Sequence, residues 1–297
     1  MRISVTGSSG LIGSALVPLL TAEGHEVGRV VRSTTAGDAW RWDPGTGHFD
    51  AGAVNGMDAV VHLAGESIAA GRWSAARKAR IRDSRVRGTR AVAEAVARAD
   101  PRPQALLCAS AMGFYGDRGE ERLTEASAPG LGFLSEVSRE WEEACAPARD
   151  RGVRVANLRF GIVLSPAGGA LAKMLLPFRL GAGGVVGSGK QWWSWVALDD
   201  AVGAIRHALV TPEVSGPVNV AAPNPVTNAE FTRTLGRVLA RPTLFPVPVF
   251  AARLALGEMA DALLLASARI VPERLQQTGY VFRQPELEGA LRHLLGR

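Results

Sequence analysis

A glycine-rich segment near the start of the chain has the spacing of a dinucleotide-binding turn. Residues 6–13 are Thr-Gly-Ser-Ser-Gly-Leu-Ile-Gly. In such a turn the first glycine permits a tight bend, the second lets the backbone approach a pyrophosphate, and the third lets a helix pack closely on a strand. Free N–H groups and the dipole at the start of that helix favour the anion. We therefore expect a dinucleotide to contact Gly7, Ser9, Gly10, Leu11, Ile12 and Gly13.

The segments around this turn have the pattern of a strand, a helix and a second strand. Residues 2–5 alternate and include β-branched side chains, which predicts a strand. Residues 14–22 carry leucines at helical spacing, and residues 26–31 predict the second strand. The ordinary alternative is a plain strand–helix turn, but glycines in this frame favour a dinucleotide site.

The residue after the second predicted strand indicates which cofactor is bound. NAD-binding proteins usually carry an acid there, which holds the ribose 2′-hydroxyl. This chain has Arg32, and a guanidinium binds a 2′-phosphate through two hydrogen bonds. The sequence therefore predicts NADP(H), the alternative being a solvated arginine at a strand end.

Three further segments, residues 58–65, 105–111 and 153–164, predict buried strands with helices between them. This order indicates an α/β fold with a Rossmann-like, doubly wound parallel sheet, in which ligands bind at the carboxyl ends of the strands. The residues predicted to border the cofactor there are Leu63, Ala64, Gly65, Ser110, Arg159, Gly161 and Ile162.

The chain resembles an extended short-chain dehydrogenase/reductase through residues 6–13, HLAG at 62–65 and SAMGFYG at 110–116. It is similar in particular to the atypical "epimerase family" branch. That similarity lies in HLAGESI at 62–68, the run from Arg72 to Arg85, and residues 175–195 and 223–242. The resemblance implies a nicotinamide cofactor, a small-molecule substrate and two parts of the chain. These are a dinucleotide-binding domain of residues 1–165, to which 196–224 return, and a smaller, mostly helical substrate part of residues 166–195 and 225–297.

The proton-transfer residues of ordinary short-chain dehydrogenases are missing. Those enzymes use a Tyr, a Lys four residues later that lowers the pKa of the phenol, and a Ser. Neither tyrosine of this chain, Tyr115 or Tyr280, is followed by a lysine at that spacing. In the frame of the resemblance, the Tyr, Lys and Ser positions hold Leu134, Ser138 and Ala111. The resemblance therefore supports cofactor binding but not the usual proton transfer.

Three side chains are candidates for a catalytic role in place of these residues. Glu66 follows the Gly65 turn and would suit a base if it were desolvated, the alternative being an acid favoured by the start of a helix. Ser110 and Tyr115 are hydroxyl donors expected near the nicotinamide. The chain is thus predicted to be an NADP(H)-dependent oxidoreductase or epimerase. The alternative is a non-catalytic NADP(H)-binding or redox-sensing protein.

Residues 184–191 nearly match a phosphate-binding loop, but Gln191 stands where a Ser or Thr would hold Mg²⁺. An aromatic run, residues 192–195, follows in place of a helix. We expect instead a glycine-rich flap over the substrate and an aromatic wall to its pocket. The alternative is tryptophan packing between the two parts of the chain. The predicted pocket residues are Gly189, Gln191, Trp192 and Trp195.

The C-terminal third is predicted to be mostly helical. Asp199 is expected to cap a helix that ends at Leu209, and residues 218–220 to form a strand. Residues 227–230 have the pattern of a capping box. A further helix is expected over residues 249–270.

The net charge of +6 is concentrated in residues 72–102, which carry ten basic and three acidic side chains. On a helical wheel Ile81, Gly88 and Val92 share an apolar face, and Arg85 lies about 40° from Ile81. A cation turned toward a core needs an anion. Arg85, at the position of an active-site Asn in the resemblance, is therefore predicted to contact a cofactor phosphate. The cations predicted to be solvated are Arg82, Arg87 and Arg90.

Composition excludes several classes of protein. Hydrophobic residues make up 47% of the chain, which excludes disorder, and no apolar stretch of about 18 residues predicts a membrane span. A nucleic-acid partner is not expected, because aromatic side chains are not interleaved with the cations. The five histidines lack metal-ligand spacing. With only Cys108 and Cys145, and a strand that begins directly after Met1, we expect a cytoplasmic monomer or homodimer.

Overall fold

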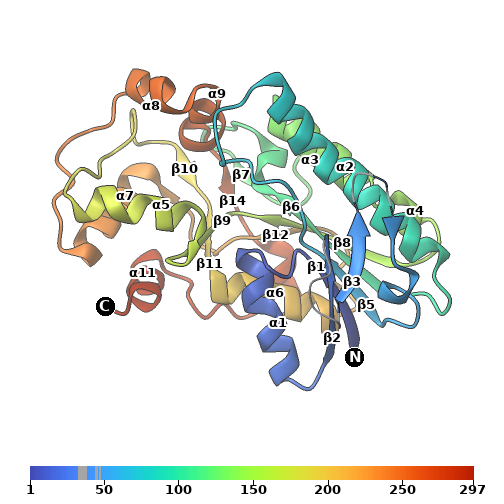
Figure 1. The fold of residues 1–297 in the computed structure, drawn as a ribbon. Helices are drawn as coiled ribbons and strands as arrows, with labels where there is room; N and C mark the ends of the chain where they lie inside the picture. The colour runs from blue at the N-terminus through green and yellow to red at the C-terminus, as the bar shows by residue number, and fades with distance from the viewer. Residues whose placement is uncertain (33–38, 44–45, 47) are drawn as a thin grey trace.

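An eight-stranded sheet runs through the centre of the molecule (Figure 1). The computed structural model describes residues 1–32, 39–43, 46 and 48–297, with the backbone alone for His48. The strands of this sheet are β1 (Arg2–Thr6), β2 (Glu26–Val31), β3 (Ala39–Asp43), β4 (His48–Phe49), β5 (Ala59–His62), β6 (Ala105–Ala111), β8 (Arg154–Phe160) and β12 (Gly216–Val220).

The topology of the sheet is that of a doubly wound fold. The strand order is β12-β8-β6-β5-β1-β2-β3-β4, and neighbouring strands are parallel except β3 and β4. From β1 the chain first adds strands on one side and then on the other, so the order reverses between β1 and β5. The predicted α/β class is confirmed, and in doubly wound folds ligands bind beyond the carboxyl ends of the strands at such a reversal.

Helices cover both faces of the sheet. The first pair, α1 (Leu11–Ala22) and α6 (Leu198–Val210), pack against each other on one face. The opposite face is covered by α2 (Ala75–Arg98), α3 (Phe133–Glu143) and α4 (Ala146–Arg149), as Figure 1 shows. The interior strands are therefore buried on both faces, as expected for their nearly continuous apolar sequences.

A second core lies in the C-terminal part of the chain. It packs α5 (Gly169–Arg179), α7 (Asn228–Leu239) and α11 (Leu287–Leu295) around Trp193, Trp195 and Phe231. The capping box predicted at residues 227–230 is confirmed, because Thr227 Oγ1 accepts the Glu230 N–H and the Glu230 carboxylate accepts the Thr227 N–H. Other short elements in the described part of the chain include β7 (Arg122–Leu123), β10 (Trp192–Trp193), β13 (Val226–Thr227), α10 (Glu273–Gln277) and two 3-10 turns (Ala51–Ala53 and Met112–Tyr115).

Three predicted boundaries are wrong. Residues 153–164 form β8 and a separate strand, β9 (Ile162–Ser165), which pairs with β11 (Trp195–Ala197). Asp199 does not cap α6, because that helix begins at Leu198 and its N-cap residue is Ala197. The single helix expected over 249–270 is divided by Gly257, whose φ of +62° ends a right-handed helix. The segment instead contains α8 (Val249–Leu256), α9 (Glu258–Ala260), a π-helical turn (Asp261–Leu265) and β14 (Arg269–Ile270).

His62 ends β5 in the interior of the molecule. Its Nδ1 lies 2.7 Å from Oγ1 of Thr6 on β1, and its ring lies edge-on to Trp42 with 5.4 Å between ring centroids. Burial lowers the pKa of His62 to about 4, so the imidazole is neutral at pH 7. A neutral ring thus packs between the ends of the two central strands.

We predict that His62 makes stability fall as pH drops from about 6.5 to about 4. In that window the unfolded chain binds a proton that the folded chain does not, so the unfolded state binds more protons and stability rises with pH. The loss between pH 7 and pH 4 is roughly 3 kcal/mol. Urea unfolding of the wild type and His62→Asn across this range measures it, and identical pH dependence in the two proteins would contradict it.

Candidate functional site

The glycine-rich turn joins β1 to α1 at the carboxyl edge of the sheet. Gly7 has a φ of +68°, and a Cβ there would lie 2.7 Å from the carbonyl carbon of Leu63. A Cβ on Gly13 would lie 2.3 Å from the carbonyl oxygen of Gly7. Both distances are too short for any side chain. The tight bend and the close helix packing predicted from the spacing are therefore present.

The start of α1 is open to an anion. Its N-cap, Gly10, has no side chain to accept a hydrogen bond, and no acid lies in the first turn. Ser9 and Gly10 are exposed, while Leu11 and Ile12 are half-buried behind them. The free N–H groups and the positive end of the helix dipole suit a pyrophosphate. The backbone of this turn thus fits the phosphates of a dinucleotide.

Arg32 lies at the same edge of the sheet, directly after β2. The register pairs Thr6 of β1 with Val30 of β2, so Arg32 is two residues beyond the level of Thr6, beside the glycine-rich turn. Its side chain is exposed and makes no hydrogen bond or ion pair with the residues that the structure describes. A cation is therefore available where the adenosine ribose of a dinucleotide is expected.

A second cation, Arg85 of α2, lies beside the segment that follows β5. Its Nη1 donates to the carbonyls of Glu66, at 2.9 Å, and Ile81, at 3.2 Å. Its Cζ lies 5.0 Å from the ring centroid of Trp141, and the guanidinium lies directly beside Gly65. Burial lowers the pKa of Arg85 to about 10, against the opposing charge of Glu66. The side chain is still charged at pH 7, beneath the turn formed by residues 63–65.

The other arginines of α2 divide into two groups. Arg87 and Arg90 are exposed and pair only along their own helix, as predicted. Arg82, expected to be solvated, has a side chain that is 41% exposed, and it also pairs with α3, where its Nη2 lies 2.8 Å from Glu140 Oε1. A wheel drawn for one helix cannot show the acid on its neighbour. The predicted apolar face is confirmed, since its three members are buried: Ile81, Gly88 and Val92.

Glu66 is not in a desolvated setting. About 35% of its side chain is exposed, and Oε1 lies 3.7 Å from Nη2 of Arg77. Its backbone N–H donates to Ser84 Oγ at 3.1 Å. The condition under which we expected Glu66 to act as a base, burial of the carboxylate, is therefore not met.

Ser110 and Arg159 take part in one buried ion pair. Arg159 donates from Nε and Nη2 to the two carboxylate oxygens of Glu142, at 2.7 and 2.8 Å. Ser110 Oγ donates to the same carboxylate at 2.7 Å. The exposed fractions of the Arg159 and Glu142 side chains are 4% and 12%. Glu142, which sequence reasoning missed, thus joins α3 to β6 and β8.

Tyr115 extends this network toward the edge of the sheet. Its hydroxyl accepts from Arg159 Nη1 at 2.9 Å and lies 2.6 Å from Asn219 Oδ1 of β12, to which it donates. The side chain is fully buried. Burial raises the pKa of the Tyr115 phenol, although Arg159 and Asn219 oppose the shift. The structure thus places Ser110 and Tyr115 inside the molecule with their hydroxyls already hydrogen-bonded.

Gly161 and Ile162 lie where the chain passes from β8 to β9. The Gly161 N–H donates to Val220, and the Ile162 N–H donates to Ser194 at 2.8 Å. A Cβ on Gly161 would lie 2.7 Å from the carbonyl oxygen of Ser194. These two residues are at the carboxyl edge of the sheet but are also required for its connection to β11.

The predicted aromatic wall of a substrate pocket is only partly present. Trp195 is fully buried and donates to the carbonyl of Asn224. Gln191 is buried and donates to the carbonyls of Val186 and Leu264, both at 3.0 Å. Trp195 belongs to the second core, and both side chains already have hydrogen-bond partners in the interior. Gly189 is buried as well, whereas Trp192 is half-buried beneath Arg269, whose Cζ lies 4.4 Å from the ring centroid.

Three long side chains connect the segment after β5 to the C-terminal part. Lys78 Nζ lies 2.6 Å from Glu258 Oε1, and Lys173 Nζ donates to the carbonyl of Ala69 at 2.7 Å. Arg72 donates to the carbonyl of Leu254, at the end of α8. Arg72 and Lys78, which lie in the run from Arg72 to Arg85, therefore hold the segment after β5 to α8 and α9.

Metal and membrane sites are not found in the described ranges. No three His, Cys, Asp or Glu side chains gather there as metal ligands. None of the helices in that part of the chain combines the length and apolarity needed to cross a bilayer.

Comparison with known proteins gives consistent relatives. Residues 3–221 match the model of the NAD dependent epimerase/dehydratase family, and residues 247–294 match a domain of unknown function, DUF1731. An epimerase family protein of Mycobacterium tuberculosis, MT2273, is 44% identical over 290 residues, which are 97% of this chain and 96% of that protein.

Two solved structures are similar throughout this chain. The crystal structure of human epimerase family protein SDR39U1 with NADPH is 35% identical, with a TM-score of 0.92 and complete coverage of both chains. A nucleoside-diphosphate sugar epimerase from Corynebacterium glutamicum is 40% identical, with a TM-score of 0.83. That alignment covers all of this chain and 58% of the other.

We predict that Glu142→Gln destabilises the protein by about 3 kcal/mol, because it leaves the Arg159 charge buried without a partner. The matched control is Glu143→Gln, the next residue, whose side chain is 73% exposed. Its effect is expected to stay below about 0.5 kcal/mol. Urea unfolding of the three proteins measures both values. Equal losses in the two variants would show that the buried pair contributes no more than a surface one.

Proposed function

Because the chain belongs to the NAD dependent epimerase/dehydratase family, we propose that it binds NADP(H) as an atypical short-chain dehydrogenase-like oxidoreductase or epimerase. The observation that carries this proposal is the glycine cradle, where no side chain fits at Gly7 or Gly13 and no acid opposes an anion at the start of α1. The NADPH in the structure of the human relative supports the choice of cofactor.

In this proposal the pyrophosphate lies on the turn of residues 7–13, and Arg32 holds the 2′-phosphate. The nicotinamide half then extends over the ends of β5, β6 and β8, beside residues 63–65 and Gly161–Ile162. Bound NADP(H) supplies hydride transfer, and the protein supplies binding and orientation. Residues 166–195 and 225–297 form the part that receives the small-molecule substrate, with Trp192 as the remaining aromatic candidate.

Of the three side chains considered for proton transfer, only Glu66 is accessible, but its carboxylate lacks the burial that would suit it as a base. It follows the Gly65 turn and has an exposed carboxylate, whereas the hydroxyls of Ser110 and Tyr115 are already hydrogen-bonded in the interior. A phenol that acts as a base needs a lowered pKa, and burial raises that of Tyr115.

The burial and hydrogen bonding of Ser110 and Tyr115 also favour a second candidate function, a non-catalytic NADP(H)-binding or redox-sensing protein. The helix positions that would carry the usual Tyr and Lys hold Leu134 and Ser138, and Ser138 is buried. A screen of NADPH oxidation against a panel of carbonyl compounds separates the two functions. Turnover supports the oxidoreductase, and tight cofactor binding without turnover supports the sensor.

Arg32→Ala is expected to weaken NADPH binding by about tenfold to a hundredfold, the effect of losing charge-assisted hydrogen bonds to a phosphate. NADH binding should not change, because NADH has no 2′-phosphate. Fluorescence titration of both cofactors measures this. The control is Arg29→Ala, which replaces an exposed arginine on β2. Equal affinities of the wild type for NADPH and NADH would refute the assignment.

Arg85→Ala is expected to weaken NADPH binding by about tenfold, since it removes a cation that makes no ion pair with a described carboxylate. Arg87→Ala, on the same helix but 78% exposed, should bind as the wild type does. The same titration measures both variants, and Arg85→Lys tests whether charge alone restores affinity. An Arg85→Ala protein that melts normally and binds NADPH normally would remove Arg85 from the site.

A further inference from the structure

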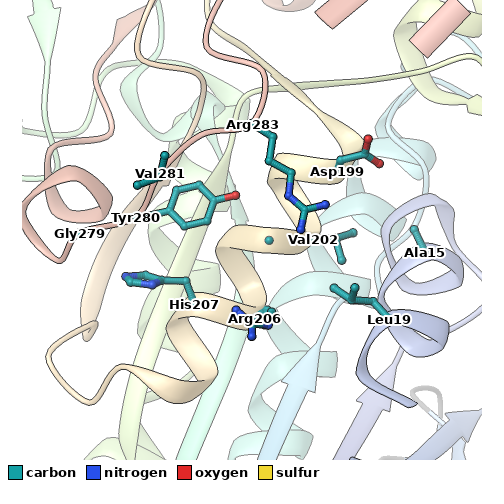
Figure 2. Close-up of a pocket in the computed structure, with 11 residues that line it drawn as sticks. Ala15, Leu19, Asp199, Val202, Arg206, His207, Gly279, Tyr280, Val281 and Arg283 are labelled. Carbon is teal, nitrogen blue, oxygen red and sulfur yellow. The ribbon is translucent and has the colours of Figure 1, made fainter. Parts of the chain in front are cut away.

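A hollow of about 370 Å³ lies between α1, α6 and the loop of residues 279–283 (Figure 2). Leu19 of α1 and Val202 of α6 are among its apolar lining residues, and the ring of Tyr280 lies on the opposite side. Pockets for small organic ligands have volumes of about 300–1,000 Å³. The hollow is therefore large enough for a compact organic molecule.

A buried carboxylate fixes the loop that closes this hollow. Asp200 is fully buried, and its Oδ1 accepts from the Tyr280 hydroxyl at 3.0 Å and from the Arg283 N–H at 2.8 Å. Its other oxygen accepts from the Gln284 N–H at 2.9 Å. A Cβ on Gly203 would lie 2.4 Å from the Tyr280 hydroxyl, so a glycine there admits the ring. The Tyr280 ring and the backbone at Arg283 are thus set before any ligand arrives.

The charges around the hollow leave one cation without a partner. Arg206 is paired with Glu23 at 2.6 Å. The Asp199 carboxylate lies 2.6 Å from His293 Nε2, a contact that is an ion pair only when that ring is protonated. Arg283 makes no side-chain hydrogen bond or ion pair within the described ranges. Figure 2 shows its guanidinium extending toward Val202, between Tyr280 and Asp199.

The histidine in the lining does not add charge at neutral pH. His207 Nε2 lies 2.9 Å from Oγ1 of Thr278. Burial, together with the charge of Arg206, lowers the pKa of His207 below its ordinary value. The cation of the hollow that has no partner among the described residues is therefore Arg283.

From these contacts we infer that the hollow binds a small organic anion. The oxyanion, a carboxylate or a phosphate, is held by Arg283, and an apolar body lies against Leu19, Val202 and the Tyr280 ring. This site is separate from the glycine cradle, because it is built on the later turns of α1 and on α6 rather than on the start of α1. It therefore adds a second ligand to the proposed cofactor.

Calorimetric titration with benzoate, phenyl phosphate and benzyl alcohol tests this inference. At least one of the two anions is expected to bind with a Kd on the order of 1 mM, the range for a ligand of about ten heavy atoms. Benzyl alcohol, which has the ring without the charge, should bind at least about tenfold more weakly. The stronger of the two anions identifies the oxyanion that the site prefers.

The variants assign the binding to this hollow. Arg283→Ala is expected to weaken the anion by about tenfold or more. Arg233→Ala, an exposed arginine on α7 with no side-chain partner in the described ranges, should leave it unchanged. Failure of both anions to bind, equal binding of benzyl alcohol, or an unaltered Arg283→Ala protein would overturn the inference. NADPH titration of the same proteins tests the cofactor proposal independently, since Arg283→Ala should not change it.

Discussion

The buried ion pair between Arg159 and Glu142 is the interaction on which the carboxyl edge of the sheet depends. Two charges removed from water are costly unless their geometry is good and their other hydrogen bonds are satisfied. Here the contact has two hydrogen bonds, and Ser110 and Tyr115 add one each. The pair joins α3 to β6 and β8, and Tyr115 continues it to β12 through its bond to Asn219. Movement of α3 relative to β8 would separate two desolvated charges.

This constraint bears directly on function. In ordinary short-chain dehydrogenases the helix at this place presents a phenol and an ammonium to the cofactor, whereas α3 uses Glu142 to hold the sheet. The phenol that remains nearby, Tyr115, is held by Arg159 and Asn219. The proposed cofactor site does not include that network, because it consists of backbone N–H groups and of glycines that admit no side chain. The proposed cradle therefore does not require the usual Tyr and Lys, which is why binding and turnover have to be measured separately.

The features that the sequence predicts well are those set by neighbours along the chain. The turn at residues 7–13, the strand at 26–31 and the capping box at 227–230 each depend on residues within a few positions of one another. What the sequence does not show is decided by distant segments. Trp195 is buried by a core that includes α7 and α11, Gln191 donates to the carbonyl of Leu264, and Arg82 meets Glu140 across 58 residues. Glu142 carried no local signal at all, since one acid on a polar helix becomes distinctive only when Arg159 lies opposite it.

The glycine cradle and the hollow between α1 and α6 also differ in how far apart along the sequence their defining residues lie. The glycine cradle attracts phosphate through backbone groups, so its requirement is the absence of side chains, and glycine spacing records that requirement in the sequence. The hollow between α1 and α6 attracts an anion through one guanidinium, and its requirement is that Asp200 hold the loop bearing Arg283. Asp200 and Arg283 are 83 residues apart, and an acid in the first turn of a helix is ordinarily explained by the helix dipole alone. A site such as this hollow can therefore be recognised only in the folded structure, where the buried carboxylate of Asp200 meets the loop that it fixes.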